Sequence, residues 1–390
     1  MNIVIINTFY PPDGQGGAER SVSVLAEGLA DQGHKVSVLC TSDTRRASRI
    51  KGVNIFGCGK MSFFWIGDHK KHNKLSKIIW HFIDAFNIVA FFRCILLFKK
   101  IKPEVIHTNN LTGFSVSVFF AGKILRIPIV HTLRDYYLGC LTSNSMNCGK
   151  KCIRLKSLSR FATRYVDVVA GNSEYILDWH IDRDYFPKAI QQVVFNGYAY
   201  EAEPIINQKI AEVTVFGYIG NLSMDKGIDI LCAQFQRLVS TRGGKCKLLI
   251  AGTGDPVFVD KLKANYSMYS VEFLGYNDPI EFYKKIDWNI VPSVWNEPLA
   301  RVCFEPKFFG IPVISSNKGG NPEAINHKVD GLLFDPDITD DLYEKLCMAM
   351  SVNYEEYCQN SLADRKRFTI KNVVSKYVSI YSGLVRGCKL

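Results

Sequence analysis

The sequence predicts an α/β protein of two doubly wound domains that face each other across a cleft, and three observations lead to this fold class. The chain has 390 residues, which is more than one compact core normally holds. Short runs rich in Val and Ile alternate with helical patterns, as in parallel sheets covered by helices. The alternation starts again after a polar, irregular stretch at residues 196–212, which indicates a second domain.

The elements follow in order from these patterns. The first domain opens with a βαβ pattern, in which Val22, Leu25 and Leu29 lie at helical spacing between two apolar runs. Its predicted strands are residues 2–7, 35–40, 53–58, 104–108, 128–132 and 166–173. Those of the second domain are residues 213–220, 246–252, 271–275, 288–293, 312–316 and 331–335, with helices at residues 257–265, 280–285, 301–309 and 342–350.

Positive charge is concentrated in the first half of the chain. The net charge is +11, yet residues 1–200 hold 26 Lys and Arg against 14 Asp and Glu, and the remainder is nearly balanced. This asymmetry indicates that the first domain faces an anionic membrane or a phosphorylated substrate, although a charged surface kept for solubility is the alternative. No nucleic-acid partner is expected.

Residues 78–98 form an apolar stretch of nearly membrane-spanning length. They are interrupted by His81, Asp84, Asn87 and Arg93, and charges at the centre of a span are costly. Flanking lysines lie on both sides. The stretch is therefore either an amphipathic helix at an anionic bilayer surface or a core helix with basic ends.

Cysteine usage and the N-terminus indicate a reducing compartment. The chain has 12 cysteines, several of them inside apolar runs, which is typical of buried reduced thiols. The first residues lack the pattern of a signal peptide. We expect a cytoplasmic protein.

The first glycine cluster lies between the first strand and the first helix. Gly14, Gly16 and Gly17 place backbone N–H groups and a helix N-terminus where an anion could bind. The spacing is not that of a dinucleotide-binding turn, and no acidic residue ends the second strand. NAD binding is therefore not expected.

The second domain offers a lysine and two carboxylates. Lys226 lies in a glycine-containing connection between strand and helix, where a lysine can hold a phosphate, although such loop lysines are often merely solvated. Glu297 and Glu305 stand eight positions apart after the strand at residues 288–293. A helix beginning near Pro298 would direct free N–H groups of Leu299 and Ala300 at a ligand. The alternative is a capping acid at Glu297 and a surface helix acid at Glu305.

Together these segments resemble the family-four retaining glycosyltransferases of GT-B architecture over nearly the whole chain. The matching segments include GGAERSVSVLAEGLADQGHKVSVL, IVHTLRDYY, YIGNLSMDKGIDIL, LLIAGTGD, IVPSVWNEPLARVCFE and GIPVISSNKGGNPEAI. The E-x7-E motif is specific because it lies between PSVW and GIPVI. The resemblance implies two Rossmann-like domains, an acceptor-binding one at residues 1–195 and a donor-binding one at 196–390, with the last helix packing back on the first.

The resemblance also implies roles for single residues. Glu305 would bind the ribose of a nucleotide sugar, Glu297 the hydroxyls of the donor sugar, and Lys226 the leaving diphosphate. His131 would contact the donor sugar, although a histidine ending an apolar strand is as often a core residue. The remaining donor-binding residues are Gly16, Gly17, Asn221, Gly252, Gly254, Pro298, Leu299, Ala300 and Arg301.

One residue departs from the family pattern. Asn221 stands where the family commonly has Arg, so that one diphosphate cation is missing, and Arg301 or another basic residue could assist Lys226. No protein nucleophile is visible, which implies that the acceptor attacks on the face that the diphosphate leaves. We expect no cofactor and no divalent metal.

Three cysteines after the His131 segment are a weaker signal. Cys140, Cys148 and Cys152 could bind Zn²⁺ if a fourth ligand came from elsewhere, but their spacing matches no closed structural site.

The sequence thus predicts a glycosyltransferase, peripheral at the inner face of the membrane, that transfers a sugar from a nucleotide sugar to a lipid-linked or phosphorylated saccharide acceptor in surface polysaccharide or glycolipid biosynthesis. A non-catalytic GT-B subunit that binds nucleotide sugars and a sugar-nucleotide epimerase are the alternatives.

Overall fold

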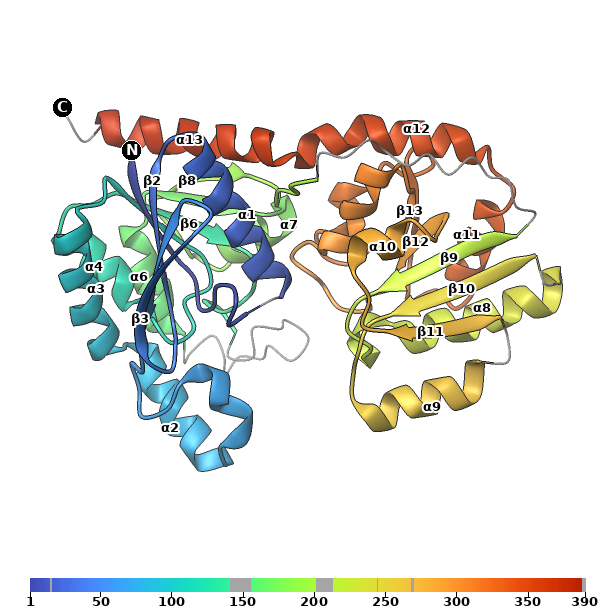
Figure 1. Cartoon of the computed structure of the whole chain (residues 1–390), viewed down its shortest axis with the longest axis horizontal. Helices are drawn as coiled ribbons and strands as arrows, with labels where there is room; N and C mark the ends of the chain where they lie inside the picture. The colour runs from blue at the N-terminus through green and yellow to red at the C-terminus, as the bar shows by residue number, and fades with distance from the viewer. Residues whose placement is uncertain (15, 141–155, 201–212, 244, 268–269, 388–390) are drawn as a thin grey trace. The chain divides into compact units, whose positions relative to one another are not determined.

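The computed structural model describes residues 1–14, 16–140, 156–200, 213–243, 245–267 and 270–387, which form two compact α/β units (Figure 1). One unit comprises Met1–Ala199 together with Thr369–Leu390, and the other comprises Tyr200–Phe368. We refer to them as unit 1 and unit 2. The sequence analysis placed the division at residue 196, four residues earlier, and assigned residues 369–390 to the second domain with the last helix packed on the first.

The sheet of unit 1 has eight strands in the order β3-β4-β2-β1-β5-β6-β7-β8. Every neighbouring pair is parallel except β3 and β4, which are antiparallel at one edge. The strands are β1 (Asn2–Ile6), β2 (Lys35–Cys40), β3 (Arg45–Ile50), β4 (Val53–Cys58), β5 (Val105–Thr108), β6 (Ile129–Leu133), β7 (Val168–Gly171) and β8 (Ile190–Val193). The sequence analysis did not predict β3 or β8.

The described helices of unit 1 cover this sheet (Figure 1). They are α1 (Gly17–Asp31), α2 (Lys74–Ala85), α3 (Ile88–Ile101), α4 (Ser117–Ile124), α6 (Ser157–Ala162), α7 (Glu174–Ile181) and α13 (Ile370–Gly387), with short 3-10 helices η1 (Ile66–Lys71) and η3 (Thr163–Tyr165). Val22, Leu25 and Leu29 of α1 are buried, as the helical spacing predicted.

The last helix belongs to the core of unit 1. Helix α13 packs against α1, where Gly28 allows close approach because a Cβ there would lie 2.9 Å from Val374. Its two tyrosines reach the sheet: the Tyr377 hydroxyl lies 2.8 Å from Thr132 Oγ1 and the Tyr381 hydroxyl lies 2.6 Å from His107 Nδ1. Buried polar groups are therefore paired across this contact.

The single helix expected over residues 78–98 is wrong, because the chain breaks into α2 and α3 with a bend of 45°. Helix α2 ends at Ala85, and Asn87 caps α3 by accepting a hydrogen bond from the N–H of Ala90 at 3.0 Å. Asp84 is buried and accepts hydrogen bonds from the N–H of Gly113 and the hydroxyl of Tyr137. The polar side chains Asp84 and Asn87 thus point into the unit.

Unit 2 contains a six-stranded parallel sheet in the order β11-β10-β9-β12-β13-β14. Its strands are β9 (Thr214–Ile219), β10 (Cys246–Ala251), β11 (Val271–Gly275), β12 (Trp288–Val291), β13 (Val313–Ser316) and β14 (Gly331–Phe334). Its α-helices are α8 (Ile228–Arg242), α9 (Pro256–Tyr266), α10 (Pro279–Tyr283), α11 (Asp341–Ala349) and α12 (Tyr354–Asp364).

Short 3-10 helices complete unit 2: η4 (Met224–Lys226), η5 (Arg301–Cys303), η6 (Glu305–Phe309), η7 (Asn321–Ala324) and η8 (Arg365–Phe368). The predicted α-helix over residues 301–309 therefore consists of two 3-10 segments. Both sheets agree with the expected doubly wound α/β class.

Candidate functional site

The candidate site of unit 2 lies where three neighbouring strands end. Strands β9, β12 and β13 are adjacent and parallel, so the loops after them leave the sheet at one edge. These loops carry Lys226, Glu297 and Gly319. The carboxyl ends of parallel strands are the usual place for a ligand in such sheets.

A partly buried ion pair forms the centre of this site. The Nζ of Lys226 donates to Oε1 of Glu297 at 2.8 Å, and the hydroxyl of Ser293 donates to the same oxygen. Glu297 is 7% exposed, whereas the side chain of Lys226 keeps 27% of its surface accessible. The ammonium group can therefore still be reached by an anion while it neutralises the carboxylate.

Glycines allow the loops to approach each other at this pair. Gly319 has φ +60°, and a Cβ there would lie 2.1 Å from the carbonyl oxygen of Glu297. The same oxygen accepts a hydrogen bond from the N–H of Gly320 at 2.8 Å. Gly227, with φ +68°, approaches Pro292 equally closely. A side chain at either glycine would separate the loops.

The second glutamate of the motif is also paired. Oε1 of Glu305 accepts from Nε of Arg301 at 2.6 Å, and Oε2 accepts from the hydroxyl of Tyr283 at 3.2 Å. Glu305 is only 4% exposed, which contradicts the alternative that it is a surface acid. Arg301, which was expected to assist Lys226 at a diphosphate, forms an ion pair with Glu305 instead.

The helix terminus predicted at Pro298 is wrong. Residues 298–300 are irregular, and the first helical residue is Arg301. The N–H of Ala300 donates to Oδ1 of Asn321 at 2.9 Å, and both Leu299 and Ala300 are buried. The N–H of Ala300 that should have received an anion is therefore already bonded inside the protein.

The glycine-rich ends of β9 and β10 lie against each other. Gly252 has φ +141°, and a Cβ there would lie 1.7 Å from the carbonyl oxygen of Gly220. Gly254 forms an isolated β-bridge with Leu222, and a Cβ at Gly254 would lie 2.1 Å from the carbonyl oxygen of Leu222. Asn221 lies between them, exposed, and its side-chain amide donates to the Ser223 hydroxyl at 3.0 Å. This short amide adds no charge where the related family has Arg.

In unit 1, Glu19 in the first turn of α1 covers the N-terminus of that helix. Gly16 is the N-cap and Gly17 the first residue of α1. The N–H of Gly16 is hydrogen-bonded to the carboxyl group of Glu19, and burial raises the pKa of that carboxyl. An anion that binds at Gly16 and Gly17 would have to displace Glu19.

His131 lies inside β6 and is 3% exposed. Its Nδ1 is 2.8 Å from the Thr108 hydroxyl, and its ring stacks on Phe186 with centroids 5.5 Å apart. Burial lowers the pKa of His131 to about 3, so the ring is neutral near neutral pH. This packing also agrees with the alternative of a core histidine.

A polar cluster that the sequence analysis missed lies at the ends of β1, β5 and β6. Asn110 donates from Nδ2 to Asp135 and accepts from the Thr8 hydroxyl. Asp135 also accepts from the N–H of Tyr137 at 2.8 Å, and burial raises the pKa of Asp135. The segment HTLRDYY contained this aspartate, but nothing in it distinguished Asp135 from a turn residue.

Of the three residues missed in unit 2, two belonged to quoted segments and Tyr283 lay in the predicted helix at residues 280–285. Ser293 follows strand β12 in PSVW, Asn321 follows the paired glycines in KGGNPEAI, and Tyr283 ends α10. A polar residue directly after a buried strand is a usable signal, which applies to Ser293. The contacts of Asn321 and Tyr283 join segments about twenty residues apart, and no local pattern indicates them.

Of the three cysteines considered for a metal, Cys148 and Cys152 lie outside the described residues, and Cys140 is buried. Within the described ranges, no group of three or more His, Cys, Asp or Glu side chains could hold a metal ion. No single helix of the described ranges has the length and apolarity of a membrane span; α2 and α3 reach them only as a pair, which is bent by 45°.

Comparison with known proteins identifies the family. The family described as glycosyltransferase family 4 matches residues 15–201, and the one described as glycosyl transferases group 1 matches residues 200–361. An uncharacterized 42.6 kDa protein in the cps region of Klebsiella pneumoniae is 32% identical over 394 residues, covering 98% of this chain and all of the relative. The chain belongs to the group 1 glycosyltransferases.

More distant members of this glycosyltransferase family agree. The capsular polysaccharide biosynthesis glycosyltransferase CapM of Staphylococcus aureus is 24% identical over 300 residues, which cover 68% of this chain and 73% of CapM. The crystal structure of Anabaena Alr3699/HepE in complex with UDP superposes with a TM-score of 0.72 at 19% identity, covering 98% of this chain and all of that one. The fold is therefore that of the GT-B glycosyltransferases.

Proposed function

We propose that the chain is a retaining glycosyltransferase that transfers a sugar from a nucleotide-sugar donor to a lipid-linked saccharide acceptor in surface polysaccharide or glycolipid biosynthesis. The observation that carries the proposal is the Lys226–Glu297 pair at the ends of three adjacent strands, with Glu305 buried eight residues further on. Relatives from a cps region and from capsular polysaccharide biosynthesis support the pathway. A family neighbour in complex with UDP supports a nucleotide sugar as the donor.

In this proposal the Lys226 ammonium neutralises the negative charge that develops on the leaving diphosphate. A cation that the protein already holds in place costs no reorganisation during the reaction, so it acts mainly on the transition state. Its partial exposure allows it to turn from Glu297 toward a phosphate oxygen. Glu297 then keeps the hydroxyl of Ser293 and gains hydroxyl donors from the sugar.

Glu305 is proposed to bind the ribose of the donor. Arg301 and Tyr283 hold its two oxygens in a fixed orientation, which suits a carboxylate that accepts two hydroxyl hydrogen bonds. We also propose that His131, as a neutral ring, contacts the donor sugar, and that Gly252 and Gly254 allow the nucleotide to approach the backbone. The acceptor attacks from the face that the diphosphate leaves, without a covalent protein intermediate and without a metal.

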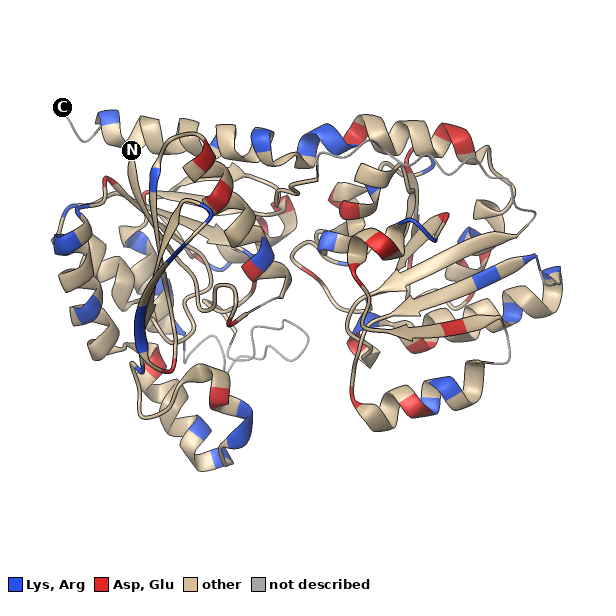
Figure 2. Cartoon of the chain, viewed as in Figure 1, with Lys and Arg blue, Asp and Glu red and all other residues tan. Residues whose placement is uncertain are grey.

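We further propose that unit 1 associates with an anionic membrane surface. Large apolar side chains project from α2: Leu75 is 67% exposed, Ile78 65% and Phe82 83%. Lys70, Lys71, Lys74 and Lys77 lie at the start of α2 or just before it, and Figure 2 shows Lys and Arg along β3 and on the helices beside it. An apolar face with a basic border is typical of proteins that lie on anionic bilayers.

The test is incubation with single UDP-, GDP- and ADP-sugars, with and without a lipid extract, and with excess EDTA in a parallel series. The proposal expects release of the nucleoside diphosphate that depends on the lipid and persists in EDTA. Conversion of the sugar without nucleotide release would favour an epimerase, and binding without any turnover would favour a non-catalytic subunit. Loss of activity in EDTA that Mn²⁺ restores would contradict the assignment of Lys226 as the diphosphate cation.

A further inference from the structure

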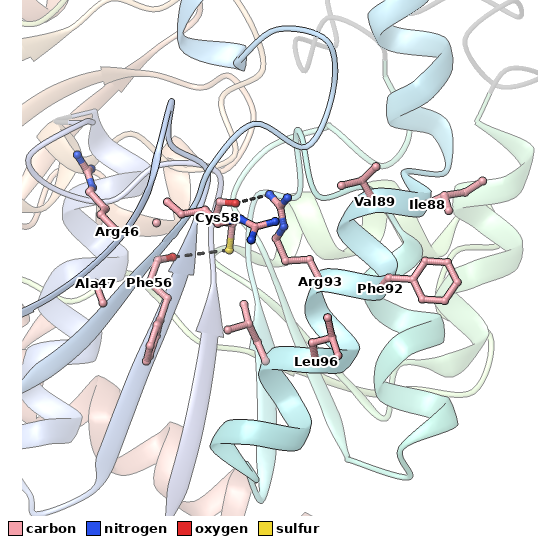
Figure 3. A pocket seen from close by; sticks show the side chains of 12 residues that line it. Arg46, Ala47, Phe56, Cys58, Ile88, Val89, Phe92, Arg93 and Leu96 are labelled. Atoms are coloured by element: carbon pink, nitrogen blue, oxygen red, sulfur yellow. Dashed lines mark hydrogen bonds between the residues drawn. The ribbon is translucent and has the colours of Figure 1, made fainter.

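An apolar groove in unit 1 is not explained by the site in unit 2. It lies between the β3–β4 hairpin and α3 and encloses about 730 Å³ (Figure 3). Phe56 on β4 and Val89, Phe92 and Leu96 on α3 contribute its apolar lining. Sites for small organic ligands typically have about 300–1,000 Å³ and a mostly apolar lining.

The only charged side chains among its described lining residues are three arginines, Arg45, Arg46 and Arg93. Arg46 pairs with Asp13. Arg93 donates to the carbonyl oxygens of Cys58 and of Lys60, the latter at 3.1 Å, and neither Arg93 nor Arg45 forms an ion pair with any described residue. Two guanidinium groups at one groove therefore lack a carboxylate partner within the described part of the chain.

These two arginines are close enough to affect each other. Burial lowers the pKa of Arg93, and the positive charge of Arg45 lowers it further. Like charges at a partly buried position are unfavourable unless an anion joins them, and guanidinium groups bind phosphate oxygens in a bidentate manner. The groove thus combines apolar walls with a site suited to a phosphate.

The arginine end of the groove lies at the carboxyl ends of the parallel strands of unit 1. Strand β4 is parallel to β2 and β1, so Cys58 at its carboxyl end lies at the same edge of the sheet as the end of β1 and the loop before α1. The arginines that touch Cys58 are at this end. A phosphate held here would therefore lie at the edge of unit 1 where ligands of parallel sheets bind.

We propose that the groove binds the hydrocarbon chain of the lipid-linked acceptor, with Arg45 and Arg93 holding the phosphate to which that chain is attached. The assignment as acceptor rests on the proposed function, whereas binding of a lipid phosphate in the groove does not. The occupant differs from a bilayer surface, which would cover the exposed apolar side chains of α2, none of which lines the groove.

Isothermal titration of the full chain with farnesyl diphosphate, an isoprenoid chain carrying a diphosphate, tests the proposal. Inorganic diphosphate and farnesol are titrated separately. We expect saturable binding of farnesyl diphosphate that is at least about tenfold tighter than the binding of inorganic diphosphate or of farnesol, because the diphosphate and the isoprenoid chain bind adjacent surfaces. Equal binding of inorganic diphosphate alone would place the anion elsewhere and overturn the proposal.

Matched variants locate the binding. Arg45→Gln should weaken farnesyl diphosphate binding about tenfold or more, whereas Arg49→Gln, an exposed arginine of the same strand that does not line the groove, should have no effect. Val89→Asp introduces a carboxylate into the groove and should weaken binding similarly, whereas Phe82→Asp on the exposed face of α2 should not. Equal effects within either pair would overturn the proposal.

The outcome is separable from that of the proposed function, because the titration contains no nucleotide sugar. Absence of nucleotide release with every donor, together with intact binding in the groove, would remove the glycosyl-transfer proposal only. Intact sugar transfer to a soluble acceptor, together with farnesyl diphosphate binding that is unchanged by substitution of Arg45 or Val89, would overturn the groove proposal only. A wild type that sediments as a dimer, together with a Val89→Asp variant that sediments as a monomer and still binds the lipid, would assign the groove to a second copy of the chain.

Discussion

Replacing Lys226 by Met would leave the Glu297 carboxylate buried without its cation. The two groups are 2.8 Å apart, and at an effective dielectric constant of about 20 their attraction is about 6 kcal/mol before desolvation is subtracted. Removing one partner of a fully buried pair costs about 3–5 kcal/mol. Because Lys226 is partly exposed and Ser293 still donates to the carboxylate, we expect a loss of about 2 kcal/mol.

This loss should appear in the thermal unfolding of unit 2. For a domain of this size, about 2 kcal/mol corresponds to a decrease in Tm of roughly 4–8 °C. Glu297→Gln keeps the shape and removes the charge, so the double variant should recover part of the stability that Lys226→Met loses. Both single variants should release nucleoside diphosphate about 100-fold more slowly, the usual effect of removing one preorganised electrostatic contact.

The assay combines calorimetry of the wild type, both single variants and the double variant with nucleotide release by each. The reasoning is refuted if Lys226→Met has the same Tm as the wild type, or if the two substitutions lower the stability additively. Stability that changes as expected, together with full turnover in Lys226→Met, would make the pair structural and remove Lys226 from the reaction.

Three further predictions follow. Glu305→Gln should raise the KM for the donor about tenfold or more with a smaller effect on kcat, because the ribose is bound equally before and during transfer; steady-state kinetics showing only a kcat effect would contradict this. Burial raises the pKa of Asp84 to about 7, above about 3.9 in the unfolded chain, so this group favours folding below about pH 4 and its contribution is lost as the pH rises to 7. Denaturant titrations should therefore show Asp84→Asn gaining roughly 2–4 kcal/mol relative to the wild type over this interval, and a difference independent of pH would refute the assignment. The chain should co-sediment with anionic but not neutral vesicles, and replacing Lys70, Lys71, Lys74 and Lys77 by Glu should release it; equal binding to both kinds of vesicle would show that charge is not the attachment.

The parallel strands were predictable because strands buried on both faces form continuous apolar runs. Strand β1 has four fully buried residues in a row. Strand β3 was missed for the opposite reason: RRASRI is exposed at every position and pairs antiparallel at the edge of the sheet. Its sequence resembles a charged loop, and only its pairing with β4 makes it a strand.

The candidate site was partly predictable. Lys226 and Glu297 could be expected near each other because both follow strands of one sheet, although their direct ion pair was not expected. The helix predicted near Pro298 does not form. The N–H of Ala300 instead donates to Oδ1 of Asn321, which lies twenty-one residues after Ala300 in the chain. The break before α3, in contrast, had a local signal in Asn87, a good N-cap before an apolar run.

The central claim is tested most directly by following a labelled sugar from the nucleotide donor into lipid. The donor that raises the Tm of the wild type is supplied with label in its sugar, together with a lipid extract, and the organic phase is counted. The account predicts that label enters the lipid phase with the wild type and about 100-fold more slowly with Glu297→Gln. Label that stays in the water phase with every donor, or that enters the lipid at the same rate with both proteins, would contradict it.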